Sequence, residues 1–234
     1  MMDRKTLGIL GGMGPLASLE FLRTIYECNL NGAVEQEYPS IVLHSLSSVP
    51  DRTGSLLNNG GKVLKDSLVR NLMVLNSSGV SKIVICCFTS HTLIGRLPKE
   101  MTEKIVSLVD LTARELMVRK EKSLLLASLG SYQRHLFRST PDAIMAKEYI
   151  VEPEDKDKIF IHGLIYEYLK PGKDVSSVYT AVRGLLDKYG LSSFIAGCTE
   201  FHILSRYIYA NSLPGISFVD PLFTIAWRLE EILE

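Results

Sequence analysis

Short apolar runs of strand length alternate with longer amphipathic segments along almost the whole chain. The apolar runs lie at Thr6–Leu10, Ile41–His44, Ile83–Cys86, Ile105–Val109, Ser123–Ala127, Glu148–Val151, Ser193–Ala196 and Ile216–Val219. Helical patterns lie between most of them, at Ala17–Asn29, Gly61–Asn76, Leu111–Arg119, Asp157–Leu169, Val175–Tyr189 and Pro221–Leu233. Strands that alternate with helices are typical of proteins built around parallel sheets. The pattern therefore predicts an α/β fold.

Two of the predicted strands are followed by a loop that carries a cysteine. The segment IVICCFTSH places Cys87 after one strand, and the segment FIAGCTEFH places Cys198 after another. A histidine lies four residues beyond each cysteine, His91 in the first segment and His202 in the second. The strands fall into two sets with one such loop each, so the sequence predicts two similar lobes.

The two lobes are expected to share one site. In open parallel sheets, ligands bind outside the carboxyl ends of the strands. We therefore expect two pseudo-symmetric lobes, each a parallel sheet flanked by helices, with the active site in the cleft between them. The expected first lobe comprises residues 1–103 and is completed by the C-terminal segment 214–234, and the expected second lobe comprises residues 104–213.

The composition argues against several classes of partner. The 234 residues include 26 Lys and Arg and 26 Asp and Glu, so the formal net charge is zero. Proteins that bind nucleic acid or anionic membranes usually carry a basic surplus, and no apolar stretch approaches the roughly 18 residues of a membrane span. The four cysteines show no paired framework, which is typical of a reducing compartment. We expect a cytoplasmic protein that binds neither nucleic acid nor membrane.

Cys87 and Cys198 have the placement of reactive thiols, since each follows a buried strand and precedes polar residues. Cys28, within a predicted helix, and Cys86, within a predicted strand, are expected in the core. Two thiols on opposite faces of one carbon can remove a proton from one side and return a proton to the other. Such a pair inverts a stereocentre without a cofactor. A free thiol has a pKa of about 8.5, so a modest decrease yields a base near neutral pH.

Zinc binding by Cys87, His91, Cys198 and His202 is the alternative interpretation of the same residues. A histidine in the first helical turn after a cysteine points back into the structure, and no close cysteine pair has metal-ligand spacing. The sequence favours packing or supporting roles for the two histidines, and no metal.

The glycine-rich segment GILGGMGPLAS resembles the outline of a dinucleotide-binding turn only in part. Gly12, Gly14 and Ala17 have the spacing of that motif. However, the next strand ends in VLHSLSS and lacks the acidic residue that the motif requires. Glycines still allow a ligand to approach the backbone, and the amides of a helix N-terminus attract anions, so the turn suits a carboxylate as well as a phosphate.

Together these motifs resemble the aspartate/glutamate racemase family, in particular its aspartate racemase branch, which is independent of pyridoxal phosphate. The resemblance spans essentially the whole chain and rests on six segments in the family's order: GILGGMGPLAS at the N-terminus, VPDRT at 49–53, Cys-x-Thr-x-His at 87–91, IYEYLKPG at 165–172, GCTE at 197–200 and VDPL at 219–222. It implies a 1,1-proton transfer on aspartate, glutamate or a related amino acid, no cofactor, and a homodimer. By position, Cys87 and Cys198 match the two catalytic cysteines of that family.

The resemblance also implies roles in substrate binding. Arg52 matches an arginine that binds a substrate carboxylate, and its planar fork suits bidentate recognition. Lys170 matches a second basic residue, suited to the side-chain carboxylate. Further contacts are expected from residues of the other matching segments: Met13, Gly14, Thr89, Ser131, Thr199 and Glu200.

Phe88 departs from the family pattern, which usually has asparagine directly after the first cysteine. An asparagine amide can hydrogen-bond a substrate carboxylate or ammonium group, and a phenyl ring cannot. Phe88 is therefore expected at the substrate site, where it affects which side chain is accepted. Two alternative functions remain open: a non-catalytic homologue that binds an acidic ligand, and a related enzyme such as a hydantoin racemase or a maleate isomerase.

Overall fold

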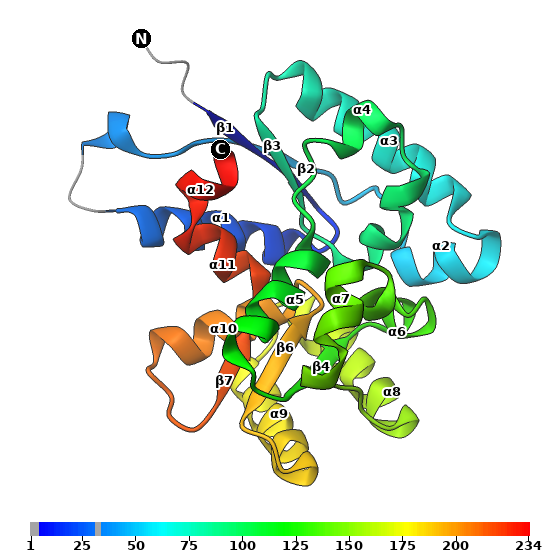
Figure 1. The fold of residues 1–234 in the computed structure, drawn as a ribbon, viewed down its shortest axis with the longest axis vertical. Helices are drawn as coiled ribbons and strands as arrows, with labels where there is room; N and C mark the ends of the chain where they lie inside the picture. The colour runs from blue at the N-terminus through cyan, green and yellow to red at the C-terminus, as the bar shows by residue number, and fades with distance from the viewer. Residues whose placement is uncertain (1–4, 31–33) are drawn as a thin grey trace.

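The protein contains two parallel sheets, which lie in the upper and lower parts of Figure 1. A computed structural model describes residues 5–30 and 34–234. The first sheet has the strand order β2-β1-β3, and the second has the order β5-β4-β6-β7. The strands are β1 (Thr6–Gly11), β2 (Ser40–Ser45), β3 (Lys82–Ile85), β4 (Ser123–Ala127), β5 (Ile150–Val151), β6 (Ser193–Gly197) and β7 (Ser217–Val219).

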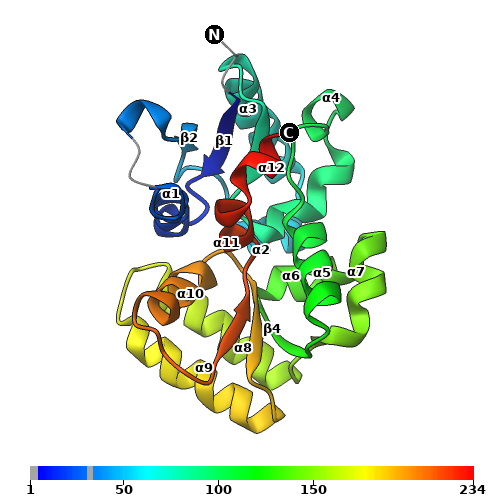
Figure 2. The same cartoon turned by 60° about the vertical axis from the view of Figure 1, so that its left-hand side comes forward.

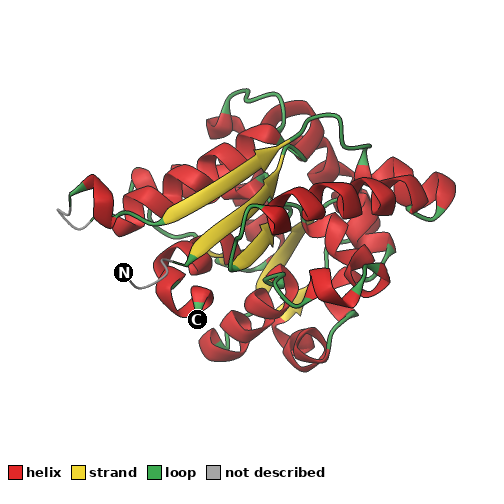
Figure 3. Cartoon of the chain, turned by 90° about the horizontal axis from the view of Figure 1, so that it is seen from above, coloured by secondary structure: helices red, strands yellow, loops and turns green. Residues whose placement is uncertain are grey.

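Helices cover both sides of the strands, as Figure 3 shows. The α-helices are α1 (Pro15–Asn29), α2 (Arg52–Asn59), α3 (Lys62–Ser77), α4 (Lys99–Thr102), α5 (Leu108–Arg119), α6 (Leu129–Gln133), α7 (Pro141–Met145), α8 (Asp155–Gly163), α9 (Val175–Tyr189), α10 (Phe201–Ala210), α11 (Pro221–Trp227) and α12 (Leu229–Leu233). Short 3₁₀ helices span Glu35–Glu37, Phe88–Arg96, Leu136–Arg138 and Ala146–Tyr149. Every residue of β4 and β6 is buried, as expected for apolar parallel strands that are covered on both faces.

The two sheets repeat one arrangement. In each, the first strand in the sequence is central and its next two strands lie on either side, in the orders β2-β1-β3 and β5-β4-β6. All pairings are parallel. The third strand of each set, β3 or β6, leads to one of the two cysteine loops. The predicted α/β fold with two similar lobes is therefore confirmed.

The C-terminal segment contacts both lobes. Strand β7 pairs with β6 of the four-stranded sheet, whereas α11 packs against α1 and α5. Figure 2 shows α11 at the level of α1, and α12 following it toward the strands of the first lobe. The expected lobe boundaries at 103/104 and 213/214 stay a prediction, and residues 1–4 and 31–33 of the first range lie outside the described residues.

One predicted strand is wrong. The segment Ile105–Val109 forms only a single bridge, between Ile105 and Ile83. The chain turns into α5 at Leu108, because the Ser107 side chain accepts a hydrogen bond from the backbone of Asp110 and caps the helix. The strand predicted at Glu148–Val151 shortens to Ile150–Val151, since a 3₁₀ turn occupies the residues before it.

Two predicted helices are present but are not continuous α-helices. Asp220 caps α11 and Pro221 occupies its first turn, as expected. This helix ends at Trp227, however, because the backbone of Arg228 leaves the helical region (φ −116°, ψ 32°) before α12 begins. The helix predicted at Asp157–Leu169 begins at Asp155 and continues as a π-helical segment over Leu164–Leu169. No helix in residues 5–30 and 34–234 combines the length and apolar character that a membrane crossing requires.

Candidate active site

Cys198 lies between the end of β6 at Gly197 and the start of α10 at Phe201. Its side chain is buried, and its Sγ donates a hydrogen bond to Glu200 Oε2 at 2.8 Å. Burial raises the pKa of the Cys198 thiol well above its usual range, the Glu200 carboxylate raises it further, and nearby Lys170 lowers it. Cys198 is therefore a protonated thiol at neutral pH in this state.

Glu200 presents a second carboxylate oxygen that has no partner. The residue is only 2% exposed, and Oε1 makes no hydrogen bond among the described residues. This oxygen faces the glycine-rich turn, because a Cβ atom added at Gly14 would lie 2.8 Å from it. Glycine at position 14 thus leaves room for the carboxylate. A buried acceptor without a donor is energetically costly, so this position suits a ligand that brings a donor.

Cys87 follows β3 in extended backbone and is 5% exposed. Burial lowers the pKa of the Arg52 guanidinium, but the neighbouring Cys87 and Glu200 side chains outweigh this effect, and the pKa is raised. Cys87 also raises the pKa of the Cys198 thiol, after the larger effects of burial and Glu200. One arginine is therefore near groups from both cysteine loops.

Arg52 is the first residue of α2, and Asp51 caps this helix by accepting from the backbone of Gly54. Its Nη2 donates to the Met13 carbonyl at 2.5 Å, which joins α2 to the glycine-rich turn. The turn depends on Gly12, whose φ of +86° is unfavourable for other residues. Arg52, Met13 and Gly14 are thus brought together, although the Met13 side chain itself is in the core.

Hydroxyl groups join the two lobes beside the cysteines. Thr89 Oγ1, from the loop of Cys87, lies 2.8 Å from Ser128 Oγ and 3.2 Å from Ser131 Oγ, which follow β4. In the other direction, Thr199 Oγ1 donates to the Cys86 carbonyl at 3.2 Å. The predicted residues Thr89, Ser131 and Thr199 therefore all take part in contacts between the lobes.

Lys170 contacts a residue that sequence reasoning missed. Its Nζ lies 3.4 Å from the centroid of the Tyr166 ring. The Tyr166 hydroxyl donates to Asp51 Oδ2 at 2.8 Å, which links the π-helical segment to the cap of α2. Tyr166 lies four residues before Lys170, one helical turn away, and this spacing was the available signal.

Phe88 lies in the core. Its side chain is 1% exposed, and its ring centroid lies 5.3 Å from that of Phe137 and 6.1 Å from that of His91. A contact between Phe88 and a substrate stays a prediction.

The two histidines use their ring nitrogens for contacts within the protein. His91 contacts the Cys87 carbonyl and the Leu108 amide, and His202 contacts Asp220 and Thr24. Among the described residues, no group of three or more His, Cys, Asp or Glu side chains is arranged to hold a metal ion. A separate cavity of about 430 Å³, lined by residues that include Asp110, Arg114 and Arg228, contains none of the predicted site residues.

The fold and the site define a two-lobed α/β protein with a buried thiol after the third strand of each lobe. A sequence model of the Asp/Glu/Hydantoin racemase family matches residues 10–229, and the chain belongs to this family. The protein is accordingly an isomerase, a cofactor-independent amino-acid racemase.

Solved structures of aspartate and glutamate racemases share the fold of this chain. The aspartate racemase of Picrophilus torridus has 20% sequence identity and a TM-score of 0.77, covering 98% of this chain and 94% of that one. A putative Asp/Glu racemase of Yersinia pestis has 19% identity and a TM-score of 0.72, covering 98% and 100%. The glutamate racemase of Francisella tularensis, solved with D-glutamate, has 13% identity and a TM-score of 0.63, covering 100% and 81%.

Replacement of Glu200 by glutamine should make Cys198 more reactive. The change removes the carboxylate charge that raises the pKa of the thiol, so a larger thiolate fraction forms at pH 8. We expect iodoacetamide to alkylate Cys198 faster in this variant than in the wild type. Mass spectrometry of the labelled peptides measures the rate. Cys28, outside the site, is the internal control and should react as in the wild type. An unchanged Cys198 rate would show that Glu200 does not control this thiol.

Proposed function

We propose that this racemase acts on aspartate or glutamate through a two-thiol proton transfer by Cys87 and Cys198. The observation that carries the proposal is the position of Arg52, which donates to the Met13 carbonyl of the glycine-rich turn and is near both Cys87 and Glu200. A permanent cation near Cys87 suits a substrate with a carboxylate next to the reacting carbon. The aspartate racemase of Picrophilus torridus and the glutamate racemase of Francisella tularensis share this fold and support the same substrate class.

Each charged group of such a substrate has a complementary residue. Arg52 would bind the α-carboxylate, and Lys170 the side-chain carboxylate. The unpartnered Oε1 of Glu200 would accept from the substrate ammonium group, since this buried oxygen lacks a donor. Hydroxyl and backbone groups of the remaining site residues would complete the binding: Met13, Gly14, Thr89, Ser131 and Thr199. Phe88 would shape the pocket from behind Cys87.

The reaction needs one thiolate and one thiol. Cys198 is protonated in this state, so Cys87 as thiolate would first take the α-proton of one enantiomer, and Cys198 would then give its proton to the opposite face of the resulting carbanion. The enzyme is then left with the proton on Cys87 and the charge on Cys198, the form that accepts the other enantiomer. Atoms and charge balance without a cofactor.

We further propose a cytoplasmic location and a homodimer. The first is supported by the four cysteines, all of which are free thiols. The second is supported by an apolar surface made of Tyr209 and Trp227, which are 59% and 50% exposed with ring centroids 6.2 Å apart. Large exposed aromatic side chains are typical of protein interfaces.

Replacement of either Cys87 or Cys198 by serine should slow racemisation by about 10²- to 10⁴-fold, because a hydroxyl is too weak an acid to replace a thiol in proton transfer. Each variant should still exchange the α-proton of one enantiomer with deuterated water through its remaining thiol, and the two variants should prefer opposite enantiomers. Proton NMR of D- and L-aspartate and glutamate measures both rates. Wild-type racemisation by a folded variant would show that the replaced thiol is not a base.

Replacement of Arg52 by lysine should lower kcat/KM by roughly 30-fold, equivalent to about 2 kcal/mol, because an ammonium group cannot make the two-pronged contact of a guanidinium. A coupled assay with aspartate and glutamate measures the change. The exposed Arg23 provides a control, since Arg23→Lys should leave kcat/KM unchanged. The carboxylate role fails if Arg52→Lys turns over both substrates like the wild type.

Replacement of Trp227 by glutamate should yield monomers if the surface of Tyr209 and Trp227 joins two copies, because the charge would be buried without a partner. Sedimentation velocity measures the species present. Val118→Glu alters another exposed apolar residue, 78% exposed, and should leave the dimer intact. A monomeric wild type would contradict the proposed dimer.

A further inference from the structure

The Cys-x3-His spacing occurs twice, and the proposed reaction uses only the cysteines. His91 and His202 are both buried, with exposed fractions of 7% and 0%. His91 lies on the 3₁₀ helix that begins directly after Cys87, and His202 lies on α10, which begins three residues after Cys198. Two buried polar rings at equivalent positions require an explanation from their contacts.

His91 connects the backbone of Cys87 to the start of α5. Its Nε2 accepts a hydrogen bond from the Leu108 amide at 3.2 Å, and Leu108 is the first residue of that helix. The Nε2 atom therefore carries no proton, and Nδ1 donates to the Cys87 carbonyl at 3.0 Å. Burial lowers the pKa of the His91 ring, in agreement with this neutral form. The ring thus holds Cys87 and α5 at a fixed distance.

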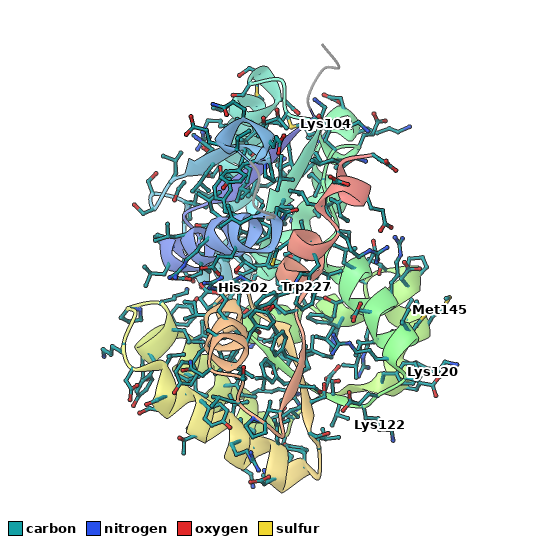
Figure 4. All side chains as sticks on the ribbon, turned by 90° about the vertical axis from the view of Figure 1, so that its left-hand side faces the viewer. Lys104, Lys120, Lys122, Met145, His202 and Trp227 are labelled. Atoms are coloured by element: carbon teal, nitrogen blue, oxygen red, sulfur yellow. The ribbon has the colours of Figure 1, made fainter. Side chains whose placement is uncertain are left out.

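His202, on the helix α10 that follows the Cys198 loop, makes a connection to α11. Its Nδ1 donates to Asp220 Oδ2 at 2.7 Å, and Oδ1 of Asp220 accepts from the Leu222 amide in the first turn of α11. Its Nε2 lies 2.8 Å from Thr24 Oγ1 of α1. Figure 4 shows His202 at the boundary between the lobes, where α10 meets α1.

The two helices that receive these contacts connect the lobes. Helix α5 contacts the 3₁₀ helix after Cys87 on one side and α7 and β7 on the other. Helix α11 packs against α1 and also against α5. In Figure 1, both helices lie between the two sheets. His91 therefore joins the backbone of Cys87 to the N-terminal end of α5. His202 joins α10, the helix after the Cys198 loop, to the N-terminal end of α11.

We propose that His91 and His202 are positioning residues that set where the Cys87 and Cys198 thiols lie relative to each other, each through its own connecting helix. This inference rests on the proposed two-thiol reaction. In this proposal, His91 positions the thiol of Cys87 for its proton transfer, and His202 positions the thiol of Cys198 for the other transfer. A displacement of about 1 Å can cost roughly 10²-fold in rate, so this control is important for the chemistry.

The proposal predicts a kinetic effect that a general loss of stability would not produce. Loss of one histidine displaces one thiol and raises the barrier of one proton transfer. Since the equilibrium constant of racemisation is one, kcat/KM must fall equally in both directions. The transfer at the undisturbed thiol stays fast and reversible, so the enantiomer that reacts there exchanges its α-proton with solvent faster than it inverts.

The experiment compares His91→Leu and His202→Leu with His91→Gln and His202→Gln. Leucine removes both hydrogen bonds, whereas the glutamine amide supplies a donor and an acceptor at similar spacing. Thr112→Val on α5 and Ser205→Ala on α10 are matched controls, because each removes a buried hydroxyl whose only side-chain hydrogen bond within residues 5–30 and 34–234 is to its own helix backbone. Racemisation and α-proton exchange of D- and L-aspartate are measured in deuterated water, with thermal unfolding of every variant.

We expect both leucine variants to racemise about 10- to 100-fold more slowly. They should show excess exchange for opposite enantiomers, and the glutamine variants should recover most of the rate. The controls should keep the wild-type ratio of exchange to racemisation even where they unfold at lower temperature. Equal ratios for both enantiomers in every folded histidine variant would overturn the proposal. If a leucine variant does not fold, the corresponding glutamine variant provides the test through a smaller shift in the same ratio.

A second measurement separates this inference from the proposed function. If the wild type racemises neither aspartate nor glutamate, the proposed substrate class is wrong, and the histidines are then tested by iodoacetamide labelling. His91→Leu should change the labelling rate of Cys87 more than that of Cys198, and His202→Leu should do the reverse. Equal changes at both thiols in both variants would overturn the positioning role.

Discussion

The hydrogen bond from the Cys198 thiol to the Glu200 carboxylate constrains the rest of the site. Both groups are buried, where ionised forms are costly, and their contact is favourable only when the sulfur is protonated. The buried negative charge of Glu200 also requires a nearby cation. Arg52 is such a cation, and Glu200 contributes to the raised pKa of its guanidinium. The absence of a side chain at Gly14 leaves room for the carboxylate. The positions of a cation, a glycine and a thiol are thus linked to one acidic side chain.

Contacts between the lobes transmit this constraint to the first cysteine loop. Thr199 reaches the Cys86 carbonyl, Thr89 reaches Ser128, and Tyr166 reaches Asp51. Each such hydrogen bond contributes only about 1 kcal/mol net, so the arrangement depends on several directional contacts rather than on one. All of them involve residues next to a proposed substrate-binding residue or next to a cysteine. The same bonds that join the lobes therefore also shape the site.

The strands and cysteine loops could be predicted from the sequence because their signal is local. An apolar run such as Ser193–Ala196 identifies a buried parallel strand by itself, and Cys198 is placed by the end of that run. The run at Ile105–Val109 misled because its apolar residues pack beside β3 without forming a ladder, and the Ser107 cap starts a helix. The Tyr166–Asp51 bond joins residues that are far apart in sequence, so no local pattern reports it.

The two lobes are symmetric in their backbone but not in the chemistry of their cysteines. Cys198 donates to the Glu200 carboxylate, and burial together with this carboxylate favours the protonated form of its thiol. A racemase with two thiols must nevertheless pass through the opposite state once in every full cycle. Because the equilibrium constant of racemisation is one, this bias cannot favour either product. It can only divide the common kcat/KM differently between kcat and KM for the two enantiomers, so the asymmetry at Glu200 changes the concentration range in which each direction works and not the final mixture.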